Sequence, residues 1–226
     1  MARRHGSRSR VWLDGFNLSG DATGIDVSLN VDMAPAHAFD ETQKHFILGT
    51  EDARASLSAL FDSDSGTAAH AVIRARENTN AIFAAVYGTP EFSFGWGGTA
   101  APVLSQAVNS QLTGAVSLSA EFQGPLHPGQ TLVPEQLNSG AGNNLDNGAG
   151  SNGGAVAILQ CEGVTQTGSI KVEHSVNGST GWSDLIDFGS TSGRSAAIGA
   201  ASGTVRQFVR ANHAGSATSI IVFRRL

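Results

Sequence analysis

Apolar and polar residues alternate strictly in three stretches of the chain. Between Gly24 and Asp32 the apolar residues Ile25, Val27, Leu29 and Val31 occupy every second position, and the residues between them are polar. The same alternation recurs from Ala53 to Phe61 and from Gly114 to Phe122. A period of two places the two sets of side chains on opposite faces of a β-strand. These stretches therefore predict strands that bury one face and expose the other to water.

Shorter apolar runs, separated by turn-forming residues, predict the other strands. In the first half of the chain we expect them at residues 11–18, 45–48, 81–87, 91–96 and 103–110, with turns at Asp14-Gly15, at Gly49 and at residues 95–98. In the second half they are expected at residues 155–161, 169–174, 182–188, 204–211 and 218–224. The alanine-rich stretch 67–76 predicts a single helix, which Ser65 or Thr67 would cap.

The order of these elements predicts a mainly β protein. A β-sandwich or barrel with one packed helix is expected over residues 11–124, and a second β-sandwich, Ig-like or jelly-roll-like, over residues 155–226. Between them, residues 125–154 are rich in Pro, Gly and Asn and predict a connector and long loop, although the second domain could begin near residue 130.

Charge separates the first ten residues from the rest. The chain of 226 residues carries 14 Lys and Arg against 19 Asp and Glu. Four of the arginines fall within residues 1–10, so the remainder has 10 basic and 19 acidic residues, a net charge of −9. Residues 1–10 predict a flexible basic arm that contacts an acidic neighbouring subunit or nucleic acid phosphates, or lies in solvent. The single cysteine, Cys161, lies in an apolar run that predicts a core position.

No residue pattern indicates catalysis or a bound cofactor. The seven histidines never show the spacing of paired metal ligands, and the chain has no nucleophile elbow, phosphate-binding loop or dinucleotide fingerprint. We therefore expect a protein that is not an enzyme and holds no metal or cofactor. The sequence also has no apolar run long enough to cross a membrane and no secretion signal, so folding in the cytoplasm and no membrane insertion are expected.

Several segments, taken in order, resemble the major tail tube proteins of long-tailed, siphovirus-type bacteriophages. They are the opening strand VWLDGFNLSG, the alternating strand IDVSLNVD, the segment AHAFDETQKHFILGTEDARASLSALFD and the helix that follows. Within them, Phe39-Asp40, Gly49 and residues 57–61 correspond to the turn, glycine and strand of that family. The likeness covers about residues 10–124, and the remainder of the chain resembles an extra domain that some phages append to this subunit.

The resemblance implies a structural virion protein, assembled in the host cytoplasm and located in the virion tail. Its hexameric rings would join their sheets into one barrel and stack into a tube that conducts DNA into the host, without binding it specifically. Tape-measure, tail terminator and distal tail proteins would be its partners. An acidic, polar lining would repel phosphates. The candidate lumen-facing residues are Asp26, Ser28, Asn30, Asp32, Ser117, Ser119 and Glu121.

Ring stacking would use segments that are weak as isolated strands, above all Met33 to Thr50 and the basic arm. The candidate inter-ring residues are Arg3, Arg4, Arg8, Arg10, Phe39, Asp40 and Lys44. Two alternatives use similar β modules. A capsid decoration or cement protein would bind a shell, and a carbohydrate-binding adhesion module would need exposed aromatic side chains such as Trp182.

Overall fold

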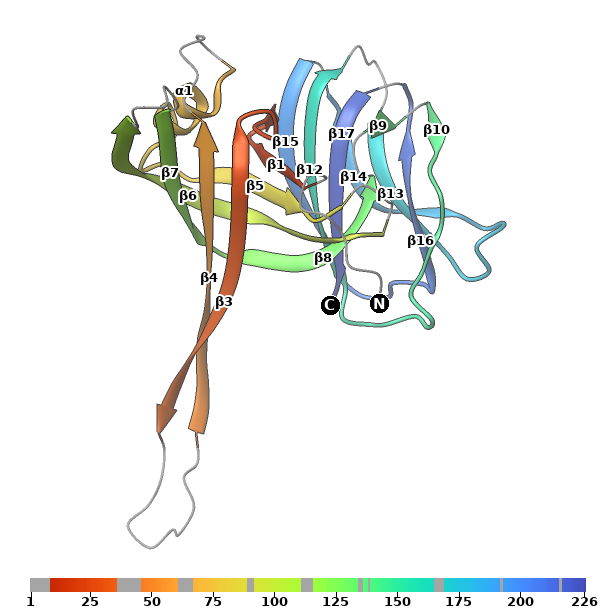
Figure 1. The fold of residues 1–226 in the computed structure, drawn as a ribbon. Coiled ribbons are helices and arrows are strands. Elements are labelled where there is room, and N and C mark those ends of the chain that lie inside the picture. Colours follow the sequence, from red (N-terminus) through yellow and green to blue (C-terminus); the bar gives the residue numbers. More distant parts are fainter. Residues whose placement is uncertain are drawn as a thin grey trace, which may run out of the picture.

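A computed structural model describes residues 9–35, 46–60, 67–88, 92–110, 116–133, 136–137, 139–164, 169–191, 193–215 and 217–226. Within these residues the chain forms antiparallel β-sheets and one short helix, which confirms the predicted mainly β fold (Figure 1). The sheets are arranged as a central curled sheet with a further layer of strands on each side.

The central sheet draws equally on both halves of the chain. Its order is β15-β12-β17-β8-β6-β5-β1-β2, so that four strands precede residue 125 and four follow it. Their bounds are β1 Arg10–Leu13, β2 Phe16–Asn17, β5 Ala81–Val86, β6 Phe94–Ser110, β8 Leu126–Val133, β12 Ala155–Val164, β15 Gly193–Ala201 and β17 Ala217–Arg225. The two halves thus share one sheet, and β9 (Gln136–Leu137) extends it by pairing with β17.

A buried apolar layer fills the inside of the curl. It consists of Trp12, Ala84, Val86, Ile158, Ile220 and Val222. The predicted turn at residues 95–98 is wrong, because these residues lie inside β6 and pair with both β5 and β8. A Cβ atom on Gly97 would stand 3.0 Å from the Ile158 side chain, so the glycine makes room for this layer rather than for a turn.

The first-half layer is a four-stranded sheet of order β3-β4-β7-β6. Strands β3 (Ala22–Pro35), β4 (Phe46–Leu60) and β7 (Val116–Gly124) join the second half of β6. Its apolar face packs on the central sheet through residues such as Leu57 and Phe122. The strands predicted at residues 45–48 and 53–61, with a turn at Gly49 between them, are replaced by the single strand β4, because its pairing with β3 runs from Phe46 to Ala59.

Helix α1 (Ala69–Arg74) is shorter than the predicted 67–76, and its cap comes from elsewhere in the chain. The residue at the N-cap position is Ala68, which makes no side-chain capping bond. Instead, the Ala69 N–H donates to the Asp21 carboxylate at 2.8 Å. A carboxylate satisfies a free helix N–H and favours the positive end of the helix dipole. The cap predicted at Thr67 is therefore replaced by a tertiary contact, and Ser65, the other predicted cap, lies outside the described residues.

The second-half layer is a five-stranded sheet made of β10 (Gly140–Ala141), β11 (Leu145–Asp146), β13 (Ser169–Ser175), β14 (Ser183–Ser190) and β16 (Phe208–His213). It packs on β12, β17 and β8 over a core that includes Cys161, whose predicted burial is confirmed. The segment 125–154, predicted as connector and loop, contains four strands, β8 to β11, which pair with β6, β16 and β17. The domain division itself stays a prediction.

Candidate functional site

The four-stranded sheet presents a polar face on the side away from its core. Strand pairing sets the rows of this face: Asp26 lies opposite Ser56, which lies opposite Glu121. In the next row Arg54 lies between Ser28 and Gln123. The apolar residues of the same strands point to the opposite face, where alanine, leucine and phenylalanine side chains are buried. The alternation read from the sequence therefore becomes one continuous polar surface.

Most of the predicted lumen-facing residues come together on this polar face. Asp26, Ser28, Asn30, Ser117 and Glu121 are exposed, and Ser119 is partly exposed. Asp32 lies in β3, but the structure does not describe its side chain. The prediction omitted Arg54, Ser56 and Ser58 of β4, which lies between β3 and β7. Their alternation was visible in the sequence, but the order of strands in the sheet was not.

The predicted inter-ring residues are mostly outside the described part of the chain. These are Arg3, Arg4, Arg8, Phe39, Asp40 and Lys44. Arg10 is described, and it differs from the expectation of a free arm. It begins β1, pairs with Val86 and is half-buried. Pairing with β5 thus makes Arg10 part of the folded sheet.

The β3–β4 hairpin extends well beyond the body of the protein (Figure 1). Strand β4 pairs with β7 only from Ala53 to Leu60, whereas its pairing with β3 continues out to Phe46 and Pro35. Among the described residues no third strand joins this outer ribbon. Leu29, at the point where the ribbon leaves the body, is 38% exposed. A two-stranded hairpin in water is marginally stable at best, so the ribbon needs further contacts.

The polar sheet has two open edges in the described part of the chain. One is the outer side of β3, which pairs only with β4. The other is the second half of β6, because β5 pairs with β6 only as far as Ala100. On that side the Pro102 carbonyl accepts a hydrogen bond from the Asn78 N–H at 3.3 Å. Each pair in the order β3-β4-β7-β6 is antiparallel, so the two edge strands run in opposite directions.

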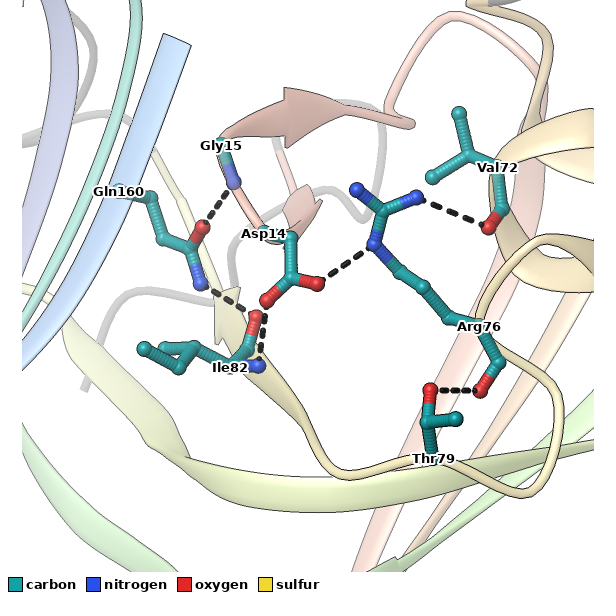
Figure 2. A network of polar contacts seen from close by, with 7 residues as sticks. All are labelled: Asp14, Gly15, Val72, Arg76, Thr79, Ile82 and Gln160. Atoms are coloured by element: carbon teal, nitrogen blue, oxygen red, sulfur yellow. Dashed lines mark hydrogen bonds and ion pairs between the residues drawn. The ribbon is translucent and has the colours of Figure 1, made fainter.

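A partly buried polar network joins the two halves of the chain (Figure 2). The β1–β2 turn has positive φ at both central residues, 48° at Asp14 and 79° at Gly15, as a type I′ hairpin requires. The predicted Asp14-Gly15 turn is confirmed. The fully buried Gln160 of β12 accepts from the Gly15 N–H at 2.6 Å and donates to the Ile82 carbonyl at 2.7 Å. One side chain from the second half thus fixes two segments of the first.

The same turn also contacts the residues that follow helix α1. The Asp14 carboxylate accepts from the Ile82 N–H at 2.7 Å and from Arg76 Nε at 2.5 Å. Arg76 also lies over the Phe16 ring, with its guanidinium carbon 4.6 Å from the ring centroid. These groups satisfy one another, so the network is a structural junction rather than a reactive site.

The described residues contain no group of three or more His, Cys, Asp or Glu side chains positioned to hold a metal ion. No described helix is both long and apolar enough to cross a membrane. Trp182, the candidate sugar platform, is partly buried, and the Arg210 guanidinium covers one side of its ring at 3.9 Å.

Comparison with known proteins finds remote structural likenesses. No family model and no curated protein matches the chain. Among solved structures, a chain from the virion of a native gene transfer agent particle is 13% identical with a TM-score of 0.41, over 56% of this chain and 98% of that one. The Dit protein of phage SPP1, a hub adsorption apparatus protein of phages that infect Gram-positive bacteria, is 11% identical with a TM-score of 0.36, over 96% and 99%. Such values are too low to assign a fold or a function.

Proposed function

We propose that this chain is a structural subunit of a phage-type virion tail, and specifically the subunit that builds the tail tube. The observation that carries the proposal is the four-stranded sheet with one polar face and two open, oppositely directed edges. Joining β6 of one copy to β3 of the next continues the antiparallel alternation. This is a head-to-tail contact, which forms a ring when the rotation closes.

The unprotected edge of β3 favours assembly with a second copy over a free monomer. Long exposed strand edges are aggregation hazards, and a closed barrel removes them. Strand β3 has no lysine, and its only proline is its last residue, Pro35. It therefore lacks two of the devices that monomeric proteins use to block an edge.

The dimensions suit a conduit for DNA. The family resemblance implies six subunits, which would supply about 24 strands to one barrel. With neighbouring strands about 4.8 Å apart and tilted by about 40° from the barrel axis, the barrel would have a backbone radius of about 24 Å. The polar face would then line the lumen and the apolar core would lie outside it. This orientation places the second-half sheet on the outside of the tube.

The outer ribbon of the β3–β4 hairpin supports stacking of rings. It carries Met33, Phe46, Ile47 and Leu48 on a two-stranded ladder that no other described strand joins. A neighbouring ring would supply the contacts that such a ribbon lacks in isolation. The predicted stacking role of residues 33–50 therefore remains part of the proposal.

Electron microscopy of the purified, concentrated protein tests the proposal. We expect hollow tubes or ring stacks, with light scattering showing a mass well above that of one chain. A monodisperse monomer at high concentration would contradict self-assembly and would favour the decoration or sugar-binding alternatives.

A proline at position 104 tests which edges meet. The outward carbonyl of Pro102 shows that the backbone groups of Leu104, two residues further along β6, also point away from β7. Leu104→Pro therefore keeps the β6–β7 ladder but removes a donor from the open edge. We expect a folded protein that forms no rings, whereas the control Leu104→Val assembles normally. Normal rings from Leu104→Pro would refute this edge contact.

A further inference from the structure

Burial on the apolar face of the four-stranded sheet decreases sharply at its β3 edge. Leu57 and Ala55 of β4 are each 1% exposed, and the β7 residues opposite them are fully buried. On the other side of β4, the opposing residues Ile25 and Val27 of β3 are only partly buried, and Leu29 is 38% exposed. Ile25, Val27 and Leu29 occupy alternate positions of β3 and so share one face. We call these three residues the apolar strip.

A hollow of about 380 Å³ lies at the start of the apolar strip. Ile25 lines it together with Val11 of β1 and Tyr87, which follows β5, and the polar residues Ser19 and Thr23 line it as well. Val11 belongs to the buried first-half core, and Ile25 and Tyr87 pack against that core. The hollow therefore leaves part of the apolar surface beside the open edge of β3 without packed neighbours, which a side chain from outside could cover.

We propose that the apolar strip is the docking site for the β6 edge of a second copy, an inference that rests on the proposed tube function. A strand that pairs with the outer side of β3 directs alternate side chains to the two faces of the sheet. Those on the core side must be apolar to cover the strip. The open part of β6 has this pattern, because Pro102 and Leu104 lie opposite the core residues Phe122 and Ala120.

A second copy fits this site better than an unrelated strand. The edges formed by β6 and β3 belong to the same sheet and run in opposite directions, so their pairing continues both the polar and the apolar face. The core of one subunit then extends into that of the next, and the apolar strip becomes buried in the closed ring.

Leu29→Asn tests this docking site. Leu29 is exposed in the isolated chain, so its replacement should leave folding unchanged but remove apolar contact from the assembled ring. Full burial of a leucine side chain changes an equilibrium constant about 10- to 100-fold, and Leu29 is already partly covered. We therefore expect the protein concentration needed for half-maximal sedimentation of tubes to rise about tenfold. Leu29→Met, which keeps the side chain apolar, should assemble as the wild type does.

Leu60→Asn is the matched control. Leu60 is the same residue type in the same sheet and is 47% exposed, but it lies on β4 opposite Ser117, on the polar face. In the proposed ring this position stays in contact with water. We expect Leu60→Asn to assemble at the wild-type concentration. Urea unfolding of each variant should give the wild-type free energy, which separates an effect on assembly from an effect on folding.

Electron microscopy of the same samples distinguishes failure of this inference from failure of the tube proposal. Normal tubes of Leu29→Asn at the wild-type concentration would overturn the docking site alone. Rings of Leu29→Asn that form but do not stack would also overturn it, because the strip would then serve contacts between rings. Absence of tubes from the wild type would overturn both proposals.

Discussion

Replacing Gln160 with leucine should weaken the contact between the two halves of the chain. The substitution removes the acceptor of the buried Gly15 N–H, and an unsatisfied buried donor costs about 1–3 kcal/mol. The Ile82 carbonyl loses the Gln160 donor but still accepts a hydrogen bond from the Asp14 N–H at 2.9 Å. The cost in stability at this carbonyl is therefore smaller than at the Gly15 N–H. Leucine is of similar size and leaves little cavity. We therefore expect the free energy of unfolding to fall by about 2 kcal/mol.

Urea unfolding followed by tryptophan fluorescence measures this change, provided that the denaturant dependence stays the same. Gln130→Leu is the control, because Gln130 is an exposed residue of β8, and it should change the free energy of unfolding by less than about 0.5 kcal/mol. If Gln160→Leu lowered the free energy of unfolding as little as this control does, the assignment of Gln160 as the junction between the halves would be refuted.

Three further predictions follow from the structure. Gly15→Ala should destabilise the protein by more than about 1 kcal/mol in the same unfolding assay, because φ is +79° and the new Cβ would lie 2.8 Å from the backbone of β15. Asp21→Ala should cost about 1 kcal/mol and loosen helix α1, seen as faster amide hydrogen exchange of residues 69–75, since it removes the cap. Burial lowers the pKa of both His174 and His213 below the ordinary 6.5, so the unfolded chain binds more protons in acid. The stability that depends on their neutral form should be fully present above pH 6.5 and should decrease as the pH falls below that value. In a His174→Gln, His213→Gln variant, the free energy of unfolding should depend less on pH between pH 6.5 and 5.

The candidate site was only partly predictable from sequence. Alternation placed Asp26 and Glu121 on polar faces correctly, because each strand separates its side chains by a local period of two. That both belong to one face, with Arg54 between them, depends on β4 pairing with β3 on one side and β7 on the other. Such pairing joins residues far apart in sequence, and no local pattern specifies it.

Glycine shows how one residue type can serve two purposes. At Asp14-Gly15 the turn requires positive φ, a local property, and the sequence predicted it correctly. At Gly95 and Gly97 the same residue type suggested a turn, yet these positions lie in a strand that is crowded by Val222 and Ile158 from the second half. Only the folded neighbours distinguish a glycine needed for its backbone from one needed for its missing side chain.

The sequence by itself determined the β class, the two-faced strands, the first hairpin turn and the buried position of Cys161. These features follow from how each side chain divides between water and core and from backbone preferences over a few residues. The tertiary structure alone decided that the two halves share one curled sheet, that Asp21 caps α1 and that Gln160 closes the junction. These contacts join segments that are distant in the chain, and their energies depend on packing and hydrogen bonding that exist only once both partners are in place.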